Sequence, residues 1–222
     1  MGEGIEETPA IWTGASCSRL APPQPGSCTS PCAPFAGRPF ISAKTTAVVP
    51  VKCCLVWDAL VQASLDPSVR RIDYLRWSQV RSAPVNVDAI ILVRDDGRVL
   101  LDVIPARPVR DLDEEGLVLI ALSELDLPTL YLRAEDIRRE PLLSNARRVW
   151  SYRLHPVGVT TRMKALSILR NAGPMALSGL MTAIRSGRDE FPAIMALACT
   201  NLVELDLSGA PLGPATTIRC QV

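Results

Sequence analysis

The alternation of hydrophobic and polar residues predicts an α/β core in the middle of the chain. Asp66-Pro67 ends the first helical pattern, and Asp95-Asp96-Gly97 supplies the residues that a tight hairpin turn requires. The expected helices are residues 54–65, 112–125, 134–140 and 143–152, and the expected strands are residues 69–77, 85–93, 99–104 and 129–132. Strands that alternate with helices in this way predict a mixed sheet flanked by helices.

A second group of elements follows from about residue 156. The pattern predicts helices over residues 161–170, 174–184 and 189–203, and then a hairpin of residues 205–207 and 216–219 around a turn rich in Gly and Pro. Three helices followed by a hairpin is the order of a winged-helix domain. Residues 1–45 are rich in Pro, Ser and Cys and show no sustained period, which predicts disorder. We therefore expect three parts, namely a disordered segment at 1–45, a core at 46–155 and a winged-helix-like α+β unit at 156–222.

Composition and charge indicate where in the cell the protein is located more than what it does. The formal net charge of +1 gives no global basic signal for a nucleic-acid partner. The longest apolar runs, residues 89–93 and 117–122, are too short to cross a bilayer, so we expect no membrane association. The amino terminus lacks the basic start and the apolar stretch of a secretory signal. These features predict a cytoplasmic protein with reduced thiols.

Neither the cysteines nor the histidine predicts a catalytic or zinc site. The seven cysteines are irregularly spaced and include no CxxC pair, and His155 is the only histidine. A structural zinc ion needs four well-spaced ligands, so free thiols are the expected state of the cysteines. His155 lies at the boundary between the two predicted units, which favours a surface or linker role over that of a catalytic base.

Asp88 and Asp102 are the most informative polar residues of the core. They stand at the outer ends of the two apolar strands that the Asp95-Asp96-Gly97 turn connects. A buried charge at either position is costly without a metal ion or a charged partner. Two carboxylates presented by neighbouring strands can hold a divalent cation, because hard cations prefer oxygen ligands. The alternative is that both are solvated residues at strand ends.

Several segments, in order and spacing, resemble the TnsA-like endonuclease subunits of Tn7-like heteromeric transposases, which belong to the PD-(D/E)xK nuclease superfamily. These segments are residues 57–69, 87–103, 133–147 and 196–217. The resemblance implies a restriction-endonuclease-like mixed sheet flanked by helices, followed by the winged-helix-like unit. It also implies that Asp88 and Asp102 bind Mg²⁺ or Mn²⁺, together with a glutamate of the preceding helix. A lysine two residues after the second acid would position the attacking water.

Two of these four positions depart from the family pattern. Val56 stands where the helix glutamate is expected, and Ile104 stands where the lysine is expected. Isoleucine neither donates a hydrogen bond nor carries charge. Asp58 lies two residues beyond Val56 and points in a different direction on a helix, while Lys52 and Arg107 are the candidates for a relocated cation. The sequence therefore predicts a degenerate catalytic site.

The resemblance implies cleavage of DNA at transposon ends beside a DDE-type transposase subunit. Given the missing residues, we expect a catalytically impaired endonuclease scaffold that acts as a structural or regulatory partner of the transposase. Two alternatives stay open: an active metal-dependent DNA endonuclease with relocated residues, and a non-enzymatic winged-helix module for DNA binding or protein interaction. The predicted third helix of the second unit is conspicuously apolar, so it suits packing against a partner as well as it suits a DNA groove.

Overall fold

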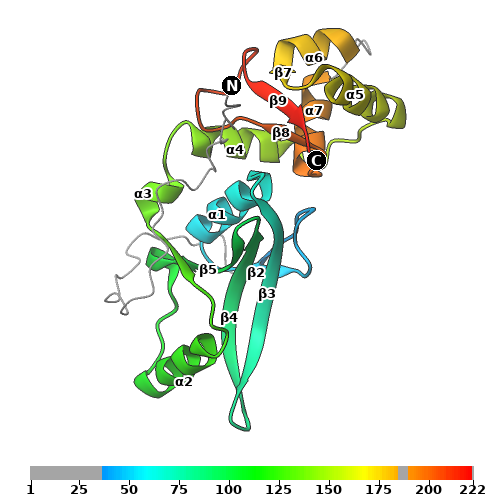
Figure 1. The fold of residues 1–222 in the computed structure, drawn as a ribbon. Helices are drawn as coiled ribbons and strands as arrows, with labels where there is room; N and C mark the ends of the chain where they lie inside the picture. The colour runs from blue at the N-terminus through cyan, green and yellow to red at the C-terminus, as the bar shows by residue number, and fades with distance from the viewer. Residues whose placement is uncertain (1–36, 185–189, 222) are drawn as a thin grey trace, which may run out of the picture.

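Four strands form the main sheet of the computed structural model, which describes residues 37–184 and 190–221 (Figure 1). Their order is β3 (Val69–Val80), β4 (Ala83–Arg94), β5 (Gly97–Val103) and β6 (Thr129–Leu132). The first three strands are antiparallel neighbours, whereas β6 is parallel to β5. A parallel neighbour requires a crossover connection, and here it contains the short 3₁₀ helix η1 (Ile104–Ala106) and helix α2 (Leu112–Ser123).

The two faces of this sheet are covered by different helices. Helix α1 (Cys54–Leu65) packs on one face, where Leu92 and Leu101 are buried with it. Helix α2 packs on the other face, where Val118 and Ala121 contact the alternate residues of β4 and β5. The alternation of side chains along the strands therefore divides their buried apolar residues between two separate clusters. The predicted mixed sheet flanked by helices is confirmed at this level.

Ordered structure begins earlier than the expected boundary at residue 46. Strands β1 (Arg38–Phe40) and β2 (Val49–Val51) form an antiparallel pair beside α1. The Phe40 ring is fully buried, stacks on Trp150 and meets Trp57 edge to face. This aromatic contact anchors a segment that the proline-rich composition suggested was disordered, and it corrects that prediction for residues 38–45. Residues 1–36 of the predicted disordered segment lie outside the described residues.

The second half of the chain combines helices with a small antiparallel sheet. Strands β7 (Met175–Ala176), β9 (Thr217–Cys220) and β8 (Val203–Leu205) lie side by side in that order. The helices are α3 (Ala134–Ile137), α4 (Leu142–Ser151), α5 (Val159–Ala172), α6 (Leu177–Ile184) and α7 (Glu190–Cys199). The predicted hairpin is confirmed, but the helix expected from residue 174 begins only at Leu177, because Met175 and Ala176 pair with β9. A local pattern does not reveal that pairing.

One continuous core joins the two halves. Its buried residues run from Phe40 through α1, α4 and α7 to Ile218. The Asn145 side chain on α4 donates to the carbonyl oxygens of Leu207 and Ala210 at 2.9 and 2.8 Å, and its oxygen accepts from the Leu212 amide at 2.8 Å. The boundary expected near residue 155 thus separates two sheets that share one core. Within the described ranges, every helix is too short or too polar to cross a membrane.

Candidate functional site

Asp88 occupies a β-bulge in the middle of β4. The pairing of β3 with β4 shifts between Leu75↔Ala89 and Trp77↔Asn86, which leaves an extra residue on β4 at this point. Asp88 has a positive φ of 49°, a conformation that aspartate adopts more readily than most residues but that still costs about 1–3 kcal/mol. Bulges and strained residues of this kind are enriched beside functional sites. The backbone conformation therefore identifies Asp88 as a candidate functional residue without reference to any sequence pattern.

Two side chains hold the Asp88 carboxylate. The Tyr74 hydroxyl donates to Oδ1 at 2.5 Å, and the Lys52 ammonium donates to Oδ2 at 3.0 Å. Burial raises the pKa of Asp88, but the hydrogen bonds from Tyr74 and Lys52 outweigh it, and the net pKa lies below its usual value. Burial, and then the bond to Asp88, raises the pKa of Tyr74, so this residue stays a neutral donor. Asp88 is consequently an ionised carboxylate with both oxygens engaged.

Asp102 is neutralised separately by an arginine. It lies on β5, and the Arg107 Nε donates to its Oδ1 and Oδ2 at 3.0 and 3.1 Å while Nη2 also contacts Oδ2. The Arg107 guanidinium also lies 5.9 Å from the centre of the Tyr131 ring, whose residue pairs with Asp102 across β5 and β6. The hydrogen bond to Asp102 raises the pKa of Arg107 further above its usual value. A charge-assisted contact of this type is among the stronger hydrogen bonds in proteins.

The two carboxylates lie on opposite faces of the sheet. Asp88 contacts Tyr74, which packs on the sheet face that α1 covers, whereas its strand neighbours Val87 and Ala89 lie on the sheet face that α2 covers. Asp102 alternates with Leu101, which lies on the α1 side of the sheet, and therefore points to the α2 side. Among the described residues, no three His, Cys, Asp or Glu side chains gather in a group that could hold a metal ion. In this arrangement Asp88 and Asp102 do not fit one shared Mg²⁺ or Mn²⁺ ion.

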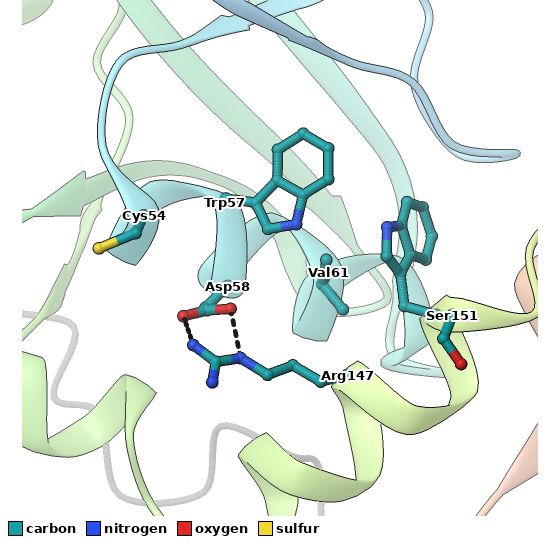
Figure 2. Close-up of a pocket in the computed structure, with 7 residues that line it drawn as sticks. Cys54, Trp57, Asp58, Val61, Arg147 and Ser151 are labelled. Atoms are coloured by element: carbon teal, nitrogen blue, oxygen red, sulfur yellow. Dashed lines mark hydrogen bonds and ion pairs between the residues drawn. The ribbon is translucent and has the colours of Figure 1, made fainter. Parts of the chain in front are cut away.

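Val56, Ile104 and Asp58 do not supply the glutamate and lysine functions that the nuclease pattern requires. Val56 is a partly buried apolar residue of α1, and Ile104 begins η1, beyond the end of β5. Asp58 is committed elsewhere: Arg147 on α4 donates to its Oδ1 through Nε at 3.0 Å and to its Oδ2 through Nη2 at 2.7 Å (Figure 2). Of the candidate cations, the structure brings Lys52 to Asp88 and Arg107 to Asp102.

The Asp58–Arg147 pair lies in a cleft of about 370 Å³ between α1 and α4. Trp57 and Val61 supply apolar walls (Figure 2), and Trp150 also lines the cleft. Only 6% of the Asp58 side chain is exposed, whereas 59% of the Arg147 side chain is exposed, so the guanidinium covers a buried carboxylate. The Trp150 Nε1 is buried without a hydrogen-bond partner among the described atoms. The bidentate pair links two helices that are distant in sequence, which is a structural role.

The thiols and the histidine add no catalytic group to this part of the molecule. Cys199 and Cys220 are free thiols. Burial raises the pKa of the Cys199 thiol to about 12, so it is a poor nucleophile. His155 is partly exposed in the connection between α4 and α5, where its backbone amide donates to the Tyr152 carbonyl at 2.9 Å. This placement agrees with the predicted linker role.

Sequence reasoning missed Tyr74, and it considered Arg147 only as part of a basic helix face and not as the partner of Asp58. Tyr74 reaches Asp88 because β3 and β4 pair across a bulge, and only the alternation of residues along β3 hinted at which face it occupies. Arg147 lies far from Asp58 along the chain, and no local pattern connects the two residues. The sequence names Lys52 and Arg107 as candidates for a relocated cation, but it does not indicate which acid each of them meets.

A scan against protein-family models gives no match to this chain, and no curated protein sequence matches it.

Proposed function

We propose that this chain is a cytoplasmic, TnsA-like protein of a Tn7-like DNA transposition system that keeps a nuclease-type scaffold and has lost strand cleavage. Its role is that of a structural or regulatory partner of a DDE-type transposase at transposon ends. The family assignment rests on the sequence resemblance of residues 57–69, 87–103, 133–147 and 196–217. The loss of cleavage rests on the geometry of the two acids.

The separation of Asp88 and Asp102 carries the proposal. Metal-assisted hydrolysis needs carboxylates that converge on one cation and leave some of its positions free for water and phosphate. Here Asp88 is bonded to Lys52 and Tyr74 on the α1 side of the sheet, and Asp102 is bonded to Arg107 on the α2 side. Each acid is already neutralised by the protein, so a divalent cation would have to displace a lysine and an arginine at once.

Helix α7 supports a partner role over direct reading of DNA bases. This helix is the expected recognition element of the second unit, yet Ala193, Ile194 and Met195 are buried, as are all the residues that follow them to Cys199. A recognition helix must present side chains to the edges of bases in the major groove. A helix that contributes its side chains to the core cannot do so, and this favours packing over groove insertion.

One observation favours the second candidate, an active endonuclease with relocated residues. The Lys52 ammonium lies 3.0 Å from Asp88 Oδ2, and its side chain is mostly exposed. A lysine beside the first acid is the cation that such a mechanism needs, and it comes from the loop before α1 instead of from β5. This candidate also requires Arg107 to release Asp102 and the two acids to reach the same ion.

Calorimetric titration of the full-length protein with Mg²⁺ or Mn²⁺, paired with a cleavage assay on plasmid DNA, tests the proposal. We expect no saturable metal binding and no metal-dependent cleavage by the wild type. Asp88→Ala is the site variant, and Asp95→Ala is the control because Asp95 is an acid of the exposed turn that joins β4 and β5. Saturable binding and cleavage that Asp88→Ala and Lys52→Met abolish, while Asp95→Ala retains both, would establish the second candidate instead.

The DNA-partner role has its own measurement. Fluorescence anisotropy with a labelled DNA duplex, repeated over a series of salt concentrations, should show binding that weakens linearly in a plot of log affinity against log salt. Absence of binding at low salt, together with absence of cleavage, would contradict both nucleic-acid functions. It would leave the protein-interaction module as the remaining alternative.

A further inference from the structure

Helix α2 is apolar on its outer side as well as on the side that contacts the sheet. Val118 and Ala121 are buried against β4 and β5. On the outer side, 92% of Leu112, 47% of Leu119 and 48% of Ile120 are exposed. A helix that is hydrophobic all round is normally buried on all sides, and clustered exposed apolar residues mark interaction surfaces. We call the surface formed by Leu112, Leu119 and Ile120 the α2 face.

The α2 face is bordered mainly by negative charge, and one of its acids, Glu115, pairs with Arg110 at 3.3 Å. Residues 111–126 contain six Asp and Glu and no Lys or Arg. Two copies of this face placed against each other would bring like charges together, which disfavours a symmetric α2–α2 contact. Residues 1–36 carry three glutamates and one arginine, so this segment of the chain is not complementary either. A surface that is apolar and basic would therefore complement the α2 face best.

Helix α5 provides a surface of that chemistry. It carries a groove of about 510 Å³ whose lining includes Val159, Arg162, Met163, Leu166 and Arg170, which we call the α5 groove. Val159 is 76% exposed and Met163 is 62% exposed. The chain from Pro141 to Arg188 contains eight Lys and Arg and no Asp or Glu, so α5 lies in the most basic stretch of the sequence. The apolar floor and the positive rim complement the α2 face.

We propose that the α2 face of one copy docks into the α5 groove of a second copy. The two helices lie at opposite ends of the molecule in Figure 1, so the faces do not meet within one copy. The contact is head-to-tail and builds open chains or closed rings. It goes beyond the proposed function and does not depend on it.

Mixing two blocked variants of the full-length protein tests this contact. Leu119→Arg blocks the α2 face, and Met163→Glu blocks the α5 groove. The wild type should form oligomers whose size increases with protein concentration. Sedimentation velocity between about 10 and about 500 µM measures this, and that range suits the weak association expected of a small interface. Each variant alone should lose association at least about tenfold, since it buries a charge in the contact. An equimolar mixture should form dimers and nothing larger, because only one competent pair of faces remains.

Controls separate docking from misfolding and from net charge. Glu135→Gln and Arg139→Gln change the net charge by the same amounts as the two blocking variants, at exposed positions of the α3–α4 region, and should associate like the wild type. Because Leu119 is only half exposed, Leu112→Arg at a nearly fully exposed position serves as a second block of the α2 face. A wild type that stays monomeric over the whole range overturns the proposal. So does a mixture of blocked variants that remains monomeric while both are folded by circular dichroism.

Discussion

Replacing Arg147 with leucine removes the cation that covers Asp58. The variant keeps most of the apolar volume of the side chain but deletes both donors of the bidentate pair, at 3.0 and 2.7 Å. Asp58 belongs to α1 and Arg147 to α4, so the change acts on the contact between these two helices. We expect the protein to fold and to be less stable than the wild type.

The stability lost in Arg147→Leu depends on how differently Asp58 and Arg147 are exposed to water. Leaving a fully buried charge without its partner costs about 3–5 kcal/mol. Here 59% of the Arg147 side chain is exposed, so water can reach the carboxylate once the guanidinium is gone. This solvation lowers the expected cost to about 2 kcal/mol. For a chain of this size, the melting temperature should fall by about 4–8 °C.

Urea unfolding followed by tryptophan fluorescence measures this loss, because Trp57 and Trp150 line the same cleft. The set comprises Arg147→Leu, Asp58→Asn, the double variant and Arg139→Leu as a control at an exposed position. If the pair stabilises the helix contact, the double-mutant cycle should give a coupling free energy of at least about 1 kcal/mol. A coupling near zero, or an equal loss in Arg139→Leu, would refute the assigned role.

Three further predictions concern titratable groups. Burial lowers the pKa of Lys44 to about 8, so the unfolded chain binds this proton more tightly than the folded protein does. The stability of the wild type relative to Lys44→Met should therefore rise between pH 8 and about 10, by roughly 3 kcal/mol at most. A stability difference in urea unfolding that does not change with pH would contradict this prediction. The pKa of Asp88 is held below its usual value, so the stability that the ionised carboxylate adds to the fold is complete above about pH 4 and is lost as the pH falls further. Tyr74→Phe should therefore lower the free energy of unfolding by about 1 kcal/mol at pH 7 and by progressively less in acid. Burial raises the pKa of Cys199 to about 12, so a thiol reagent at pH 8 should label this residue only after denaturation, as peptide mass spectrometry can show.

Local pattern was sufficient for most of the secondary structure. The helix at 54–65, the hairpin around Asp95-Asp96-Gly97 and the strand at 129–132 follow from side-chain periodicity and turn residues, which are properties of neighbouring positions. The prediction failed where a distant partner decides the conformation. Residues 38–40 become a strand because Phe40 is buried against Trp57 and Trp150, and Met175–Ala176 become a strand because β9 pairs with them.

The sequence by itself identified Asp88 and Asp102, since charges that interrupt apolar strands are visible in the order of residues alone. It also named Lys52 and Arg107 as candidates for a relocated cation. It also identified Val56 and Ile104 as residues that cannot bind metal or act on water. Only the tertiary structure decided which charges meet. The bulge at Asp88 and the alternation at Asp102 send the two carboxylates to opposite faces of the sheet, and a single sheet keeps groups on its two faces apart.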